Sequence, residues 1–236
     1  MLENFKYRTN STDENIIKEI LVKQSYRKKK INFNIEKNDV WLDGGSHIGF
    51  FALYASQNFA KKIYCFEPET ENFNLLQQNI TNMKNKFNTE YLAFKYAVNQ
   101  IGGEHEFTIA PNTWRHSLLS HYKKKLPTMK IKCIKIDDIL NQYKDINCIK
   151  LDIEGSELEI LHNEHDFSNI KKLVFEYSFT KDRDMNNFFK CVEKLQKYFD
   201  VDIQKSYYNQ KYQGKQGYWG GFIDSIIFAK AKDENK

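Results

Sequence analysis

Residues 40–56 read VWLDGGSHIGFFALYAS, in which an acidic residue and three glycines separate two apolar runs. The first run predicts a buried strand over Asp39–Asp43, and the second predicts a helix over Ile48–Asn58. Glycines between a strand and a helix permit a tight turn and let a ligand approach where a Cβ atom would clash. The helix that follows offers N–H groups without partners at its start. The stretch therefore predicts a small-molecule site at the end of the strand.

Strand and helix alternate along most of the chain. Such alternation predicts an α/β fold with a doubly wound, mostly parallel sheet, in which ligands bind beyond the carboxyl ends of the strands. The further strands are expected at Lys62–Phe66, Tyr91–Val98, Cys148–Asp152, Leu173–Tyr177, Val201–Lys205 and Ile223–Ala229. The further helices are expected at Thr70–Ile80, Asp137–Asn141, Ser156–Leu161 and Met185–Tyr198.

Two parts of the chain depart from this alternation. Alternating segments at Glu104–Ala110 and Met129–Ile134 predict an antiparallel β flap over about residues 102–135. Residues 1–36 predict an N-terminal helical extension, with a helix over Asp13–Tyr26 and a short strand at Ile31–Ile35. Residues 37–236 then form the main domain.

Composition limits the class of protein. Of the 236 residues 41% are hydrophobic, which is enough for a core. No apolar run is long enough to span a membrane, and the N-terminus lacks the apolar segment of a secretory signal, so a cytoplasmic location is expected. The four cysteines are scattered singly, which favours reduced thiols over a zinc site or disulfides. The net charge of +5 fits an anionic partner without requiring one.

The residue before the glycines distinguishes two nucleotide ligands. A dinucleotide site typically reads G-x-G-x-x-G, whereas the spacing here is G-G-x-x-x-G behind Asp43. A carboxylate at this position would repel a pyrophosphate and would suit the ammonium and sulfonium groups of S-adenosylmethionine. Glu67 ends the next strand in CFEPE, where a carboxylate can accept hydrogen bonds from both ribose hydroxyls. The alternative role for Glu67 is to cap the helix at Thr70–Ile80.

Two more carboxylates follow buried strands. Asp152 closes a strand in IKLDIEGSE, and Glu176 ends another in VFEY, so both are expected to face the same cleft. Two carboxylates are costly to bring together unless a cation, a proton or a hydroxyl lies between them. Helix capping is the alternative role for Asp152 and the favoured one for Glu157.

Six segments between Val40 and Glu176 together resemble the FkbM-type S-adenosylmethionine-dependent methyltransferases: VWLDGGSHIGFFAL, YCFEPE, YAVNQIGGEHEF, IKIDDIL, IKLDIEGSELEIL and LVFE. The resemblance implies a Rossmann-like fold and O-methylation of a hydroxyl on a sugar, a glycan or another small molecule. His47 stands where the family more often has Asn. The expected cofactor contacts are Asp43, Gly44, Gly45, Ser46, His47, Gly49, Phe50, Glu67, Pro68, Ala97, Val98 and Asp152.

A sugar hydroxyl is a poor nucleophile at neutral pH, so a nearby base is expected to add about 10²–10⁴-fold. The candidates, in order, are Asp152, Glu176 and His116, of which the last lies in the flap beside Trp114. The two carboxylates could instead bind a divalent cation, which is not favoured.

Two other functions stay open. The first is an RNA ribose 2′-O-methyltransferase that uses the lysine runs Arg27–Lys30 and Lys123–Lys125 with aromatic residues near the C-terminus, although no lysine is assigned to the cleft. The second is a cofactor-binding protein without catalysis. The acceptor, the oligomeric state and the role of Gly217–Asp224 are not assigned by the sequence.

Overall fold

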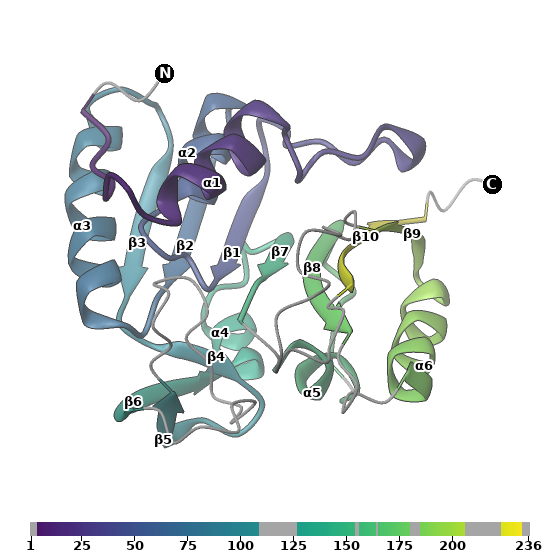
Figure 1. Ribbon diagram of the computed structural model, residues 1–236. Helices are drawn as coiled ribbons and strands as arrows, with labels where there is room; N and C mark the ends of the chain where they lie inside the picture. Colours follow the sequence, from purple (N-terminus) through teal and green to yellow (C-terminus); the bar gives the residue numbers. More distant parts are fainter. Residues whose placement is uncertain are drawn as a thin grey trace, which may run out of the picture.

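A computed structural model of the protein describes residues 4–108, 127–153, 156–163, 165–179, 185–205 and 223–232. Its main feature is a seven-stranded sheet in the order β3-β2-β1-β7-β8-β10-β9 (Figure 1). In this sheet β10 runs antiparallel to both neighbours and the other described pairs are parallel, which confirms the Rossmann-like, doubly wound, mostly parallel fold. The strands are β1 (Val40–Gly44), β2 (Lys62–Phe66), β3 (Glu90–Phe94), β7 (Cys148–Leu151), β8 (Lys172–Phe179), β9 (Phe199–Lys205) and β10 (Ile223–Ala231).

Helices cover both faces of this sheet. All five residues of β1 are buried, as expected for a strand enclosed on both sides. Trp41 points into a first core, which it shares with α2 and α3, whereas Val40 and Leu42 point into a second core, shared with α4, α5 and α6. The helices are α2 (Phe50–Gln57), α3 (Thr70–Lys84), α4 (Ile136–Gln142), α5 (Glu157–Leu161) and α6 (Met185–Gln196).

The expected strand Tyr91–Val98 is in fact two strands. It divides into β3 and β4 (Ala97–Asn99), and β4 leaves the large sheet to pair with β6 (Thr128–Lys135). Successive side chains of β4 point to opposite faces, so Ala97 packs in the small cluster of its own sheet and Val98 packs in the second core.

The predicted hairpin is confirmed where the structure describes it. β5 (Gly103–Thr108) pairs antiparallel with β6, and together with β4 they form a three-stranded sheet. In Figure 1 this small sheet lies beyond the arrowheads of β1, β2 and β3. The flap residues Trp114 and His116 lie outside the described residues.

The N-terminal residues 4–36 pack into the first core. The expected helix over Asp13–Tyr26 is shorter: α1 (Asp13–Ile17) continues as a π-helical turn, η1 (Lys18–Val22). The prediction of a strand at Ile31–Ile35 is wrong. The chain makes the 3₁₀ turn η2 (Lys29–Ile31), followed by one isolated bridge, and buries Phe33 completely against Trp41 and Phe228. The apolar residues that suggested a strand are therefore core anchors.

Two further expectations concern composition. The four cysteines are free and buried, as predicted. Within the described ranges, no helix combines the length and the apolar character that crossing a membrane requires.

Candidate functional site

The loop of residues 43–49 follows β1 and leads into α2. Its backbone is fixed to the end of β2, because the N–H groups of Gly45 and Ser46 both donate to the carbonyl of Phe66 at 3.0 Å. Gly45 has a φ of +75°, and a Cβ atom on it would lie 1.9 Å from the carbonyl oxygen of Asp152. His47 has a φ of +51°, a left-handed conformation that Asn and His adopt more readily than most residues. The loop thus holds the ends of β1, β2 and β7 together.

Sheet geometry brings Asp43, Lys150 and Glu176 to one face. Side chains two positions apart in a strand point to the same side. Two positions before each of these three residues, the strand has a residue whose side chain lies in the first core. Asp43 is paired in register with Lys150 across β1 and β7. The three core residues that precede them are Trp41, Cys148 and Val174.

Lys150 is a site residue that the sequence analysis missed. Its Nζ lies 3.0 Å from Oδ1 of Asp43, and it donates to the carbonyls of Gly45 at 2.8 Å and Gly44 at 3.3 Å. The sequence analysis assigned no lysine to the cleft, and the structure places Lys150 beside Asp43. The signal was a lysine inside the apolar strand CIKL, because a buried ammonium requires a charged or polar partner.

Asp43 fits a site for a cationic ligand group. Its side chain is fully buried, and its Oδ2 atom accepts no hydrogen bond from any described residue. A buried carboxylate oxygen without a donor is costly, and a ligand ammonium could supply one. Ser46 supports this geometry, since its buried hydroxyl donates to the carbonyl of Asp43 at 2.8 Å.

Glu67 lies at the end of β2 beside the same loop. Only 5% of it is exposed, and its two oxygens accept hydrogen bonds from the backbone N–H groups of His47 at 2.8 Å and Glu69 at 3.0 Å. Burial raises the pKa of Glu67 to about 7. The proposed capping role is wrong, because Glu69 caps α3 by accepting from the N–H groups of Glu71 and Asn72.

The structure also describes the predicted cofactor residues Phe50, Pro68, Ala97 and Val98. The N–H of Glu67 donates to the carbonyl of Phe94, whose ring stacks on Phe66 at 5.0 Å. Ala97 and Val98 follow from this point in β4. Phe50 packs its side chain against Phe5 in the first core, so any ligand contact by Phe50 must come from its backbone. Pro68 directly follows Glu67.

Asp152 and Glu176 come together beyond β7 and within β8. Oδ2 of Asp152 lies 3.8 Å from Nζ of Lys150, and 32% of this side chain is exposed. Burial, and then the charge of Asp152, raise the pKa of Glu176 well above its usual range. A third acid, Glu19 of η1, adds to the same effect. His116 lies outside the described residues.

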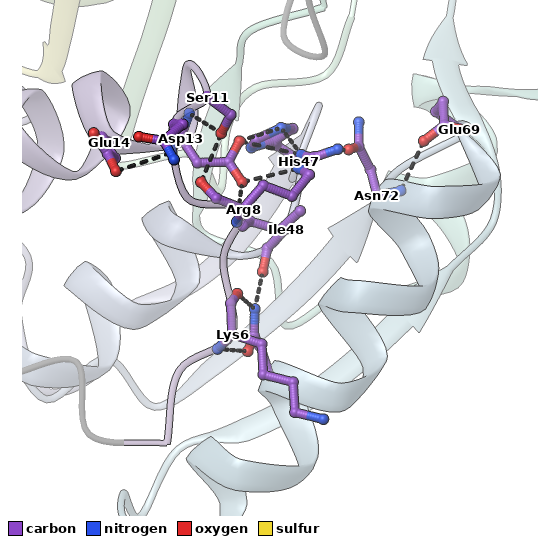
Figure 2. A network of polar contacts seen from close by, with 11 residues as sticks. Lys6, Arg8, Ser11, Asp13, Glu14, His47, Ile48, Glu69 and Asn72 are labelled. Carbon is purple, nitrogen blue, oxygen red and sulfur yellow. Dashed lines mark hydrogen bonds and ion pairs between the residues drawn. The ribbon is translucent and has the colours of Figure 1, made fainter.

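The N-terminal segment braces the loop from outside, as Figure 2 shows. Arg8 lies between the fully buried Asp13, which it contacts at 3.0 and 3.1 Å, and the side chains of His47 and Asn72, each at 2.9 Å. Because the N–H of His47 donates to Glu67, this network connects residues 4–36 with the carboxylate proposed for the ribose. No pattern in the sequence around Arg8 signals this role.

Metal coordination has no support from side-chain geometry. Within the described part of the chain, no three His, Cys, Asp or Glu side chains are grouped so that they could hold a metal ion.

Comparison with known proteins identifies the family. Residues 43–200 match the model of the methyltransferase FkbM domain, and this range includes the glycine loop, the small sheet and the carboxylates of Asp43, Glu67, Asp152 and Glu176. The chain belongs to the FkbM methyltransferase family. The predicted resemblance is confirmed, and with it the class of S-adenosylmethionine-dependent methyltransferases.

Individual relatives of this FkbM-family chain are distant. It is 27% identical to the hexuronic acid methyltransferase AglP of Haloferax volcanii over 128 residues, which are 53% of this chain and only 50% of AglP. It is 25% identical to the methyltransferase sdnD of Sordaria araneosa over 177 residues, which are 61% of this chain and 68% of sdnD. A solved precorrin-6y C5,15-methyltransferase from Geobacter metallireducens is similar with a TM-score of 0.49 and 12% identity, over 97% of this chain and 95% of that one.

Proposed function

We propose that this chain transfers the methyl group of S-adenosylmethionine to a hydroxyl oxygen of a sugar or glycan. The observation that carries the proposal is the pair Asp152 and Glu176, which lies beside the glycine loop and next to the buried ion pair of Lys150 with Asp43. The similarity to AglP supports a carbohydrate acceptor.

The cofactor is held by the loop 43–49 and by Glu67. Asp43 offers its buried Oδ2 to the ammonium group, and Glu67 accepts hydrogen bonds from the ribose hydroxyls. When bound, S-adenosylmethionine supplies a methyl group that a positively charged sulfur activates. Alignment of the acceptor oxygen with this group provides much of the acceleration.

Asp152 acts as the base for the acceptor hydroxyl. It is partly exposed and has the Lys150 ammonium at 3.8 Å, whereas burial opposes the charged form of Glu176, so Asp152 carries the negative charge at the lower cost. Burial and the charge of Asp152 raise the pKa of Glu176 well above its usual range, so in this proposal the proton of the pair lies on Glu176 and the negative charge on Asp152. This division of roles follows the general behaviour of adjacent carboxylates.

The local charge favours a hydroxyl over a carboxylate as the acceptor group. A hexuronic acid offers both, and its carboxylate needs no base. Asp152, Glu176 and Glu19 form an acidic cluster that opposes a second anion, whereas a neutral hydroxyl benefits from a base. We therefore expect a methyl ether as the product.

The alternative RNA substrate has less support. The Nζ of Lys150 already contacts Asp43 and two loop carbonyls, so it has no free N–H for a substrate. In the run 27–30, Lys28 and Lys30 both pair with Asp202. The second run, at residues 123–125, lies outside the described residues.

The test is an acceptor screen with S-adenosylmethionine labelled in its methyl group. Neutral sugars, uronic acids and short RNAs are offered to the wild type and to Asp152→Asn. We expect label in a sugar, stable to mild alkali as an ether is. In the variant, turnover should fall by about 10²–10⁴-fold while the affinity for S-adenosylhomocysteine is kept. An alkali-labile ester, label in RNA alone, or full turnover by the variant would overturn the proposal.

A further inference from the structure

Tyr26 reaches the carboxylate pair from outside the family-matched region. Its hydroxyl donates to Oε1 of Glu176 at 2.8 Å, although the two residues are 150 positions apart. The side chain is 1% exposed, and its ring packs edge-on against Phe51 at 5.2 Å between centroids. Phe51 packs in turn against Trp41, so the tyrosine is held by the first core. This packing fixes the position of the hydroxyl.

The groups around Glu176 determine what Tyr26 can do there. Asp152 and Glu19 oppose a negative charge on Glu176, whereas Lys150 and the hydrogen bond from Tyr26 favour it. Burial and the same acids raise the pKa of Tyr26 well above its usual range. Tyr26 therefore stays protonated at neutral pH and serves as a donor to Glu176.

We propose that Tyr26 is a positioning residue that the N-terminal segment contributes to the catalytic pair. Its hydroxyl holds Oε1 of Glu176, which leaves Oε2 as the atom that serves Asp152 and the acceptor. This inference rests on the proposed function. It assigns to residues before the match at 43–200 a part in positioning the catalytic pair, in addition to the brace that Arg8 forms (Figure 2).

The first experiment needs no acceptor. Protein labelled with ¹³C in its Glu side-chain carboxyls is titrated by NMR, and the Glu176 signal is assigned by its loss in Glu176→Gln. Tyr26→Phe removes a hydrogen bond that favours the ionised form, so the pKa of Glu176 should rise by about 0.5–1 unit. An unchanged titration of Glu176 would overturn the proposal.

Tyr91→Phe is the matched control. Tyr91 lies in the same core, is 5% exposed, and has its hydroxyl 2.6 Å from Oγ of Ser56. The control therefore also removes the hydroxyl of a buried, hydrogen-bonded tyrosine. The Glu176 signal should titrate in Tyr91→Phe as in the wild type, and a shift as large as that in Tyr26→Phe would show a general loosening of the core instead.

The second experiment uses the acceptor from the screen. The proposed function places a proton on Glu176, so the high-pH limb of the kcat profile should move to higher pH in Tyr26→Phe by the same shift of about 0.5–1 unit, with KM for the cofactor unchanged. In a Glu176→Gln background Tyr26→Phe should have no further effect. If the high-pH limb of the kcat profile is the same in Tyr26→Phe as in the wild type, the positioning role of Tyr26 is contradicted. Failure of the wild type to methylate any acceptor contradicts the proposed function, and the NMR result separates the two cases.

Discussion

The ammonium of Lys150 lies 3.0 Å from the carboxylate of Asp43, and neither side chain is more than 3% exposed. This ion pair joins the glycine loop after β1 to the strand that ends at Asp152. Replacing Lys150 with Met should therefore lower the free energy of unfolding by about 3–5 kcal/mol, because it leaves a buried carboxylate without a partner. Urea denaturation measures the change.

The control for this prediction is Lys62→Met. Lys62 also lies in a strand and faces a carboxylate, that of Asp145, but the pair is at the surface and should contribute less than about 1 kcal/mol. Adding Asp43→Asn to Lys150→Met should recover part of the lost stability without restoring methyl transfer. Equal losses in the two lysine variants would mean that the buried pair has no special role.

Binding of S-adenosylhomocysteine should depend on the ionisation of Glu67. The pKa of this group is about 7, so it is mostly ionised at pH 8 and mostly protonated at pH 6. Only the ionised form offers both oxygens as acceptors, and the affinity should therefore fall about tenfold between pH 8 and pH 6. Calorimetric titration at several pH values measures this slope.

Two variants distinguish titration of Glu67 from titration of His47. In Glu67→Gln the binding should be weak and independent of pH over this range. In His47→Asn the slope should persist, because the backbone N–H of His47, and not its ring, contacts Glu67. A slope that disappears in His47→Asn and persists in Glu67→Gln would assign the titration to the histidine.

Gly45→Ala should be far more destabilising than Gly103→Ala. Both glycines have a positive φ, of +75° and +84°, so both substitutions cost about 1–2 kcal/mol in backbone strain. At Gly103 nothing lies within 4 Å of the new Cβ, whereas at Gly45 it would lie 1.9 Å from the backbone oxygen of Asp152. Urea denaturation compares the two, and equal losses would show that the loop does not pack against Asp152 as described.

The brace formed by Arg8 should affect cofactor binding without touching the cofactor. Arg8→Lys keeps a positive charge beside Asp13 but cannot reach Asp13, His47 and Asn72 together. We expect affinity for S-adenosylhomocysteine to fall about tenfold, as for other residues that orient a ligand-binding group. Lys6→Ala is the control, because the Lys6 side chain makes one exposed contact, to Gln78. Equal affinities in wild type and Arg8→Lys would contradict the role of the brace.

The fold was predictable because its signals are local. The strand β2 begins and ends where the run KIYCF predicts, and the alternation of strands and helices along the chain predicted the parallel sheet. The prediction of a strand at Ile31–Ile35 failed because Phe33 is buried by contacts with residues distant in sequence. Periodicity cannot distinguish such an anchor from a strand residue.

The site was predictable at its strand ends and not beyond them. Asp43, Glu67 and Asp152 each end an apolar run, so their shared edge follows from the topology. The expectation that Glu176 also ends a strand is wrong, because β8 continues to Phe179. Tyr26 and Arg8 come from a segment with no such marker, and only the folded chain brings them to the site.

Calorimetric titration of the wild type with S-adenosylhomocysteine and, separately, with NAD decides which ligand the glycine loop accepts. We predict binding of S-adenosylhomocysteine, weakened in Glu67→Gln, and no binding of NAD. At 100 times Kd the bound ligand should also stabilise the fold by about 2.7 kcal/mol. Binding of NAD without binding of S-adenosylhomocysteine would contradict the interpretation of the DGGSHIG loop and the methyl transfer derived from it.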